Sequence, residues 1–500
     1  MKTSKKILSL VLSIIMVAVM FVPATAAVDQ SVVCPEIRVP GFVSSVIYKD
    51  KNDPASALGV PGQEEILDCI KNDVVPALIK YLTDKDAEKL GESVAEAVNT
   101  QFGDWFNNPD GSAKENAGTN FVYPAKEKVK YNSKFSFRYD WRGDPIENAA
   151  QLNDFINYIL ECTGKDKVAL TSHSQGSVVV LAYLSVYGSD KVMGVVLDTP
   201  AIDGLASVGE LFSGRTDFDG EGIASILKMI IGTTEYEELL SSIIDIFSMA
   251  GINDSLSEFL DGLYEKIGPT LLRKSLLPLF GCWPSVWSMI PDRYVYDIMD
   301  YFFENDFSGE EYAGLKTKIE NFNKTVRANK KQTLLDFDEV GRMAVVTRYG
   351  YKAVPVTKEW MLLSDSVIET SSSSLGATTA RVGEYFSDEY LEGKDMKYIS
   401  PDRTVDASTC LFPEKTWFIK NAYHSENEVT EQFYDLLLFS KEEATCDNSE
   451  MSRFMLYDRE NGEVVTDESV PVKAEKPTMF DRIFNFIKAI INKLIDFFRK

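Results

Sequence analysis

Between residues 32 and 203, apolar residues recur in two patterns, short runs typical of buried strands and longer runs with helical spacing. The strand-like runs are 37–39, 135–139, 167–170 and 192–197, and the helix-like runs are 149–162 and 178–187. Strands that alternate with helices predict a parallel sheet covered by helices on both faces. The expected fold class is therefore α/β.

The pattern changes after residue 204. The segment 205–335 has mostly helical periodicity, clearest at 223–231 and 239–247. Strand-like runs then return at 343–347, 360–363 and 417–419. The sequence therefore predicts a core in two parts, 31–204 and 336–446, separated by a helical cap insertion at 205–335.

The N-terminal segment 1–26 has the three parts of a secretory signal peptide. Lysines at positions 2, 5 and 6 precede the apolar run 7–22, and Ala24-Thr25-Ala26 supplies a small-x-small cleavage site. The run is shorter than the roughly 20 residues that a membrane-spanning helix needs. We therefore expect the protein to be secreted or associated with the cell surface.

The C-terminal segment has a different character. A polar linker is expected at 466–476, and the segment 477–500 has a wide apolar face with helical spacing. Its polar face is net positive, with Arg482, Lys488, Lys493, Arg499 and Lys500 against Asp481 and Asp496. An amphipathic helix of this kind suits an anionic membrane surface. The alternative is that it packs on the catalytic domain or on a partner helix.

Composition excludes several functions. The formal net charge of −24 argues against nucleic acid as a partner, because phosphates require a basic face. Two histidines and the absence of a C-x-x-C motif argue against a metal site, and no organic cofactor is expected. Six cysteines allow 15 disulfide pairings, and free buried thiols are an equal alternative.

A candidate nucleophile lies between a predicted strand and a predicted helix. The segment Leu170-Thr171-Ser172-His173-Ser174-Gln175-Gly176 places Ser174 where a nucleophile elbow belongs, in a turn that requires small residues two positions before and after the serine. Gly176 meets this requirement, and Ser172 stands where glycine is usual. The turn would also direct the Gln175 backbone N–H towards an oxyanion.

A serine nucleophile needs a general base within hydrogen-bond reach. His173 adjoins Ser174, so its side chain is expected to point away from the serine Oγ. His424 is then the candidate base, and it follows the strand-like run 416–420 in a loop. A histidine after the last strand fits the chain order serine, acid, histidine.

Two aspartates could orient this histidine. Asp365 follows an apolar run and precedes a serine-rich loop, and it is the favoured candidate. Asp198 ends the strand-like run 192–197 and is the alternative, because some lipases place the acid one strand earlier. A second oxyanion donor is expected at the Phe42 N–H, since Pro40-Gly41 turns the chain directly after the strand-like run 37–39.

Several motifs together resemble the lecithin:cholesterol acyltransferase family of α/β-hydrolases, which includes lysosomal phospholipase A2. The most specific is Tyr139-Asp140-Trp141-Arg142, which is similar to the family's Y-D-W-R segment. Val39-Pro40-Gly41, Thr199-Pro200 with Gly204, and Asp365-Ser366-Val367 resemble further family motifs. The departures are Ser172, one extra residue before Gly204, and Ser366 in place of glycine or threonine.

This resemblance implies the α/β-hydrolase fold, a Ser174–Asp365–His424 triad, an acyl-enzyme intermediate and a lipid acyl donor. The expected activity is hydrolysis of a lipid ester, or transfer of its acyl group to an alcohol. The apolar insertion, with Trp283, Trp287 and Met289, would form a lid or an acyl pocket. The alternatives are an esterase for non-lipid acyl esters and an inactive cell-surface binding protein of the same fold.

Overall fold

The structure is a computed structural model, which describes residues 28–59, 61–213, 256–354 and 361–471. The expected signal peptide, the amphipathic runs 223–231 and 239–247, and the expected C-terminal helix lie outside the described residues.

The centre of the molecule is an eight-stranded sheet with the strand order β12-β11-β10-β5-β4-β3-β1-β2. All neighbouring strands are parallel except β12, which runs antiparallel to β11. The strands are β1 (Glu36–Val39), β2 (Lys134–Ser136), β3 (Val168–His173), β4 (Val192–Asp198), β5 (Arg342–Tyr349), β10 (Thr416–Lys420), β11 (Phe454–Asp458) and β12 (Glu463–Thr466). The sheet therefore extends beyond residue 446, where the second part of the core was expected to end.

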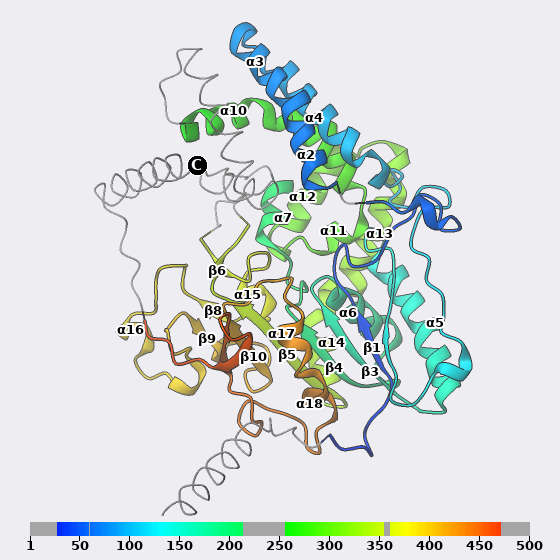
Figure 1. Cartoon of the computed structure of the whole chain (residues 1–500), viewed down its shortest axis with the longest axis vertical. Helices are drawn as coiled ribbons and strands as arrows, with labels where there is room; N and C mark the ends of the chain where they lie inside the picture. The colour runs from blue at the N-terminus through cyan, green and yellow to red at the C-terminus, as the bar shows by residue number, and fades with distance from the viewer. Residues whose placement is uncertain (1–27, 60, 214–255, 355–360, 472–500) are drawn as a thin grey trace, which may run out of the picture.

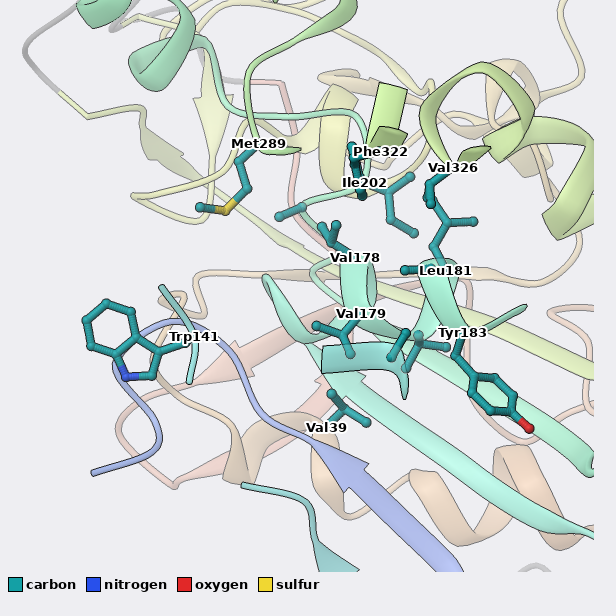
Figure 2. Close-up of a cluster of buried hydrophobic side chains, with 14 of the residues drawn as sticks. Val39, Trp141, Val178, Val179, Leu181, Tyr183, Ile202, Met289, Phe322 and Val326 are labelled. Carbon is teal, nitrogen blue, oxygen red and sulfur yellow. The ribbon is translucent and has the colours of Figure 1, made fainter. Parts of the chain in front are cut away.

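Helices cover both faces of the sheet, because the central strands carry apolar side chains on both faces. One face packs against α5 (Pro145–Thr163), α6 (Gly176–Tyr187) and α14 (Lys330–Asp338). The other packs against α17 (Glu428–Glu431) and α18 (Tyr434–Phe439). Figure 2 shows how α6 is surrounded by apolar side chains, with Val39 on one side and Val326 on another. The buried α6 gives the residues at its N-terminus a rigid support.

Two small antiparallel pairs lie outside the main sheet. They are β6 (Tyr351–Lys352) with β7 (Leu363–Ser364) and β8 (Thr378–Thr379) with β9 (Val405–Asp406), accompanied by the short helices α15 (Thr370–Ser373) and α16 (Asp388–Leu391). The run 360–363 was expected to be a strand of the core. Its last residue begins β7 instead, because Gly350, at a φ of 117°, turns the chain out of β5 into the β6–β7 pair.

A helical layer lies at one end of the sheet (Figure 1). From the predicted cap it contains α7 (Ala206–Phe212), α10 (Leu256–Leu271), the π-helical η5 (Leu272–Gly281), α11 (Pro284–Ser288), α12 (Asp292–Glu304) and α13 (Ala313–Thr325). It also contains α2 (Gln63–Cys69), α3 (Val75–Asp84) and α4 (Ala87–Phe102), from the segment that was assigned to the core. These helices form their own apolar cluster, in which Leu78 and Leu90 meet Leu263 of α10. The cap is thus built from two separate parts of the chain.

All six cysteines lie in the described part of the chain and are free thiols. Within the same residues, no helix combines the length and the apolar character that crossing a bilayer requires.

Candidate active site

Ser174 occupies a strained turn between β3 and α6. Its φ of 54° lies in the left-handed region, which is uncommon for a residue other than glycine. The Ser174 N–H donates to the Asp198 carbonyl over 3.0 Å, and the Ala201 N–H donates to the Ser174 carbonyl over 3.2 Å. A strained conformation that neighbouring segments hold in place is typical of a functional residue.

Two glycines allow the end of β1 to approach this turn closely, one shortly after β1 and one after Ser174. A Cβ on Gly176 would lie 2.0 Å from the Val39 carbonyl oxygen, and one on Gly41 would lie 2.9 Å from the Ser174 Cβ. The end of β1 and the turn therefore pack backbone against backbone. Ser172 fits where glycine is usual, because its buried Oγ lies 2.9 Å from Ser177 Oγ and donates to the Val196 carbonyl over 3.3 Å.

His424 and Asp365 are in direct contact. His424 Nδ1 lies 2.7 Å from Asp365 Oδ2, and the His424 backbone N–H donates to the Asp365 carbonyl over 2.9 Å. Asp365 follows β7, and His424 lies in the loop that follows β10. The pair fixes both the position and the tautomer of the imidazole, because a carboxylate at Nδ1 favours a proton there and leaves Nε2 as an acceptor.

The environment of Asp365 keeps it ionised. Its side chain is fully buried, and its Oδ1 accepts hydrogen bonds from the N–H groups of Val367 (2.9 Å) and Ile368 (2.7 Å). Burial raises the pKa of this carboxyl, but His424 and the two backbone donors outweigh it and leave the pKa below its usual value. The turn places Ser366 at a φ of 83°, in the left-handed region that glycine adopts most readily.

The two histidines lie side by side. Their ring centroids are 4.7 Å apart, and His173 Nε2 lies 3.0 Å from the His424 carbonyl oxygen, so its N–H donates there. His173 therefore contacts the backbone of the histidine loop, a role that its sequence position did not indicate. In the described part of the chain, no hydrogen bond joins Ser174 Oγ to His424 Nε2. Such contacts are often long in enzymes without substrate.

Asp198, the alternative acid, has other partners. Its Oδ2 accepts hydrogen bonds from Arg348 Nη2 (2.8 Å), Tyr434 OH (2.8 Å) and Thr430 Oγ1. It lies at the carboxyl end of β4, beside the turn, but the carboxylate that contacts the imidazole belongs to Asp365. The structure thus brings Asp365, and not Asp198, to His424.

The two expected oxyanion donors flank the turn. Gln175 directly follows Ser174, and Phe42 follows Gly41, whose backbone lies against the Ser174 side chain. Neither the Phe42 N–H nor the Gln175 N–H donates to another group in the described residues. Two free backbone donors beside one hydroxyl are what an oxyanion hole requires.

The Tyr139–Arg142 segment holds the loop that follows β1 and contains Phe42. Tyr139 OH donates to the Pro40 carbonyl (2.7 Å), and Trp141 Nε1 donates to the Ser45 carbonyl (3.0 Å). The Trp141 carbonyl in turn accepts from Gln175 Nε2 (2.7 Å). Asp140 and the buried Arg142 form a two-point ion pair that holds the segment itself. The Tyr139–Arg142 segment therefore holds the loop after β1 and Gln175 relative to each other.

A family model described as "alpha/beta hydrolase fold" matches residues 103–217, which include β3, the Ser174 turn and α6. The chain has the α/β-hydrolase fold. This confirms the predicted fold class and is consistent with a hydrolase in general. The matched model is broader than the lecithin:cholesterol acyltransferase family. No curated protein matches the chain.

One similar solved structure is described as the crystal structure of the Tle4-Tli4 complex. It has 16% sequence identity and a TM-score of 0.21, over 37% of this chain and 49% of that chain. The match therefore spans about half of that chain, and a likeness at this level carries no functional information.

Aromatic side chains cluster around Phe42, one of the two expected oxyanion donors. The Phe42 ring lies 4.5 Å from Trp141 and 6.0 Å from Trp283, which comes from the cap. Trp283 and Arg142 both donate to the Trp105 carbonyl, which joins the cap to the Tyr139–Arg142 segment. Trp283 of the cap thus packs against the Phe42 ring, which is itself 36% exposed.

Within the described residues, no group of three or more histidine, cysteine or acidic side chains could hold a metal ion. The sequence reasoning missed Arg348, which is fully buried on β5 and donates to the His424 carbonyl. An arginine directly after the apolar run 343–347 was the available signal, because a buried strand tolerates such a charge only with partners.

Proposed function

We propose that the protein is a serine acyl-ester hydrolase or O-acyltransferase, with Ser174 as nucleophile, His424 as general base and Asp365 as the orienting acid. The observation that carries this proposal is the 2.7 Å contact between His424 Nδ1 and Asp365 Oδ2, on the same face as a strained serine turn. Serine, base and acid appear in the chain order of α/β-hydrolase triads.

The reaction follows from these contacts. His424 Nε2 takes the proton of Ser174 Oγ as the oxygen attacks an ester carbonyl, and the ionised Asp365 stabilises the resulting imidazolium. The Phe42 and Gln175 N–H groups donate to the carbonyl oxygen as it becomes negative, and each such donor contributes about 3 kcal/mol in comparable enzymes. The imidazolium then protonates the leaving alcohol. Water or a second alcohol, deprotonated by His424, releases the acyl group from Ser174.

A lipid acyl ester is the substrate class that we favour. The Phe42 ring is 36% exposed and packs on the buried Trp141 and Trp283, so it presents apolar surface beside the proposed donors, where the acyl part of an ester would lie. Aromatic surface of this kind contributes binding free energy through the burial of apolar area. The resemblance of residues 139–142 to a lipid acyltransferase family supports the same class.

Export and membrane association complete the proposal. The N-terminal segment 1–26 supports secretion or a cell-surface location, and the segment 477–500 supports contact with an anionic lipid surface. Both segments would bring the enzyme to lipid substrates outside the cell.

Replacing Ser174 with alanine tests the nucleophile. Ser174→Ala should lose both labelling by a fluorophosphonate probe and at least about a thousandfold in ester turnover, because no other oxygen can become acylated. Ser185→Ala, on the helix α6 that follows the turn, serves as the control and should keep both. A Ser174→Ala protein that still turns over esters would show that another residue is the nucleophile.

The substrate class needs a separate measurement. Phospholipids, triacylglycerols and short-chain esters should be compared with and without an alcohol acceptor. Higher kcat/KM on the lipids supports the favoured class, and higher kcat/KM on short-chain or polysaccharide acetyl esters would favour the non-lipid esterase. The absence of both labelling and turnover would favour the inactive binding protein.

A further inference from the structure

Two fully buried charges lie directly behind the proposed catalytic residues. Arg348 and Asp198 come from the neighbouring strands β5 and β4, and both side chains are fully buried. Arg348 Nη2 lies 2.8 Å from Asp198 Oδ2. Both residues stand near the carboxyl ends of their strands, where α/β folds place their sites.

The arginine holds the histidine loop by its backbone. Arg348 Nη1 donates to the Tyr423 carbonyl over 3.0 Å and also to the His424 carbonyl. Arg348 Nη2 donates to Thr430 Oγ1 over 2.9 Å, which extends the contact beyond the loop into α17. A guanidinium can serve all these acceptors at once because its donors are fixed in one plane.

The aspartate holds the nucleophile turn by its own backbone. The Asp198 carbonyl accepts the Ser174 N–H over 3.0 Å, while the Asp198 carboxylate binds Arg348. One continuous chain of contacts therefore runs from Ser174 through Asp198 and Arg348 to His424. The two residues that must exchange a proton come from distant parts of the sequence, and this chain connects them.

Stability alone does not account for the pair. A buried ion pair contributes little net stability compared with well-packed apolar residues, because both charges lose their hydration. Arg348 Nε and Asp198 Oδ1 are also buried without a hydrogen-bond partner in the described residues, and each such atom lowers the stability of the fold. A positional role explains why so costly an arrangement lies at this place.

We propose that Asp198 and Arg348 are positioning residues, which hold the His424 backbone at a fixed distance from the Ser174 turn. The inference rests on the proposed function, since it concerns the proton transfer between these two residues. Asp365 sets the tautomer and rotation of the imidazole and accepts the His424 N–H, whereas the buried pair holds the Tyr423 and His424 carbonyls. Loss of the pair should slow the chemical step and leave substrate binding nearly unchanged.

The test compares Arg348→Lys with Arg348→Met in the full chain. A lysine keeps the charge and can reach one or two acceptors, whereas methionine keeps only the volume. We expect kcat for a soluble ester to fall about 10-fold in Arg348→Lys and about 100-fold in Arg348→Met, because small misplacements of catalytic groups have effects of this size. KM should stay within about twofold, and the rate of fluorophosphonate labelling should fall in parallel with kcat.

Arg453→Lys is the matched control. Arg453 is also buried, pairs with Glu414 (2.7 Å) and donates to two backbone carbonyls, those of Lys397 (2.6 Å) and Pro413 (3.3 Å). It directly precedes β11, so it lies at the amino ends of the strands, opposite the carboxyl ends where the proposed catalytic residues lie. We expect a similar loss of melting temperature as in Arg348→Lys, but a change in kcat below about threefold. Equal losses of kcat in the two lysine variants would overturn the inference.

Tyr434→Phe supplies a milder variant in case the arginine variants fail to fold. It removes one hydrogen bond to Asp198 and keeps the ring, so kcat should fall about threefold to fivefold at constant KM. An unchanged kcat would overturn the inference. Wild-type protein and Ser174→Ala are measured beside these variants: inactive wild type overturns the proposed function and this inference together, whereas active wild type with unaffected Arg348 variants overturns this inference alone.

Discussion

Two histidines share the catalytic face, and they differ in the atom that each one leaves free. His424 uses Nδ1 for Asp365, so its Nε2 is available to the serine. His173 uses Nε2 for the His424 carbonyl. Burial, together with the neighbouring His424 and Arg348, lowers the pKa of His173 well below its usual value, so this ring stays neutral at physiological pH. His173 therefore uses its Nε2–H to hold the histidine loop, whereas His424 has a free Nε2 and the carboxylate partner that stabilises an imidazolium, as a general base requires.

This difference gives a prediction for the two alanine variants. His424→Ala should lose at least about a thousandfold in kcat for a soluble ester, because it removes the general base. His173→Ala should lose no more than about tenfold, since it removes one of several contacts that hold the loop. The comparison requires kcat for both variants under the same conditions. A larger loss in His173→Ala would identify His173 as the base.

At the scale of elements, the segment that follows Asp365 is joined by a hydrogen bond to α7, the first helix of the cap. Glu369, four residues after Asp365, is 2% exposed, and its Oε2 accepts the Ala206 N–H of α7 over 3.2 Å. Burial raises the pKa of Glu369 to about 7, and the nearby Asp365 adds to this effect. The folded protein therefore holds a proton that the unfolded chain releases at lower pH.

The expected sign follows from this difference in proton binding. Between about pH 4.5 and pH 7 the folded state binds more protons at Glu369 than the unfolded state, so the free energy of unfolding should fall as the pH rises. Glu369→Gln keeps the neutral shape and should be more stable than wild type at pH 8, by up to about 3 kcal/mol, but not at pH 5. Urea unfolding at both pH values measures this, with the exposed Glu384→Gln as control. An equal difference at both pH values would show that Glu369 does not titrate in this range.

Local patterns predicted the nucleophile turn and most strands, whereas contacts between distant elements did not follow from the sequence. The turn at Ser174 is encoded within a few residues, because small residues at 172 and 176 lie between a strand-like run and a helix-like run. The helices between Gln63 and Phe102 have an ordinary apolar stripe that faces α10, and no local signal says which element a stripe will meet. The acid presented the same difficulty, since Asp198 and Asp365 both follow apolar runs, and only the folded chain places Asp365 against His424.

At the scale of the whole molecule, the net negative charge disfavours the proposed contact with an anionic membrane. The chain carries a formal net charge of −24, which an anionic membrane would repel. The segment 477–500 is net positive and amphipathic in sequence, so it can supply local attraction where the rest of the chain is repelled.

Deletion of residues 477–500 tests this tether. The truncated protein should bind vesicles of anionic phospholipid more weakly than the full chain, because it lacks the basic amphipathic segment. Hydrolysis of a soluble ester should stay within about twofold, since every proposed catalytic group lies outside the deletion. Vesicle flotation and ester kinetics on both proteins provide the measurements. Equal flotation of the two proteins would exclude the tether and favour packing of the segment on protein.

The order of the strands determines how much of the chain must be synthesised before the proposed activity can appear. The nucleophile turn belongs to β3 and α6, which can be formed by less than the first half of the chain, but the proposed base follows β10, which pairs between β5 and β11. A ribosome-bound chain that ends before residue 424 therefore carries the serine without its base. In the proposed mechanism, ester cleavage can begin only after the late strands have docked on the early ones, so the nascent polypeptide has no such activity while most of it is being made.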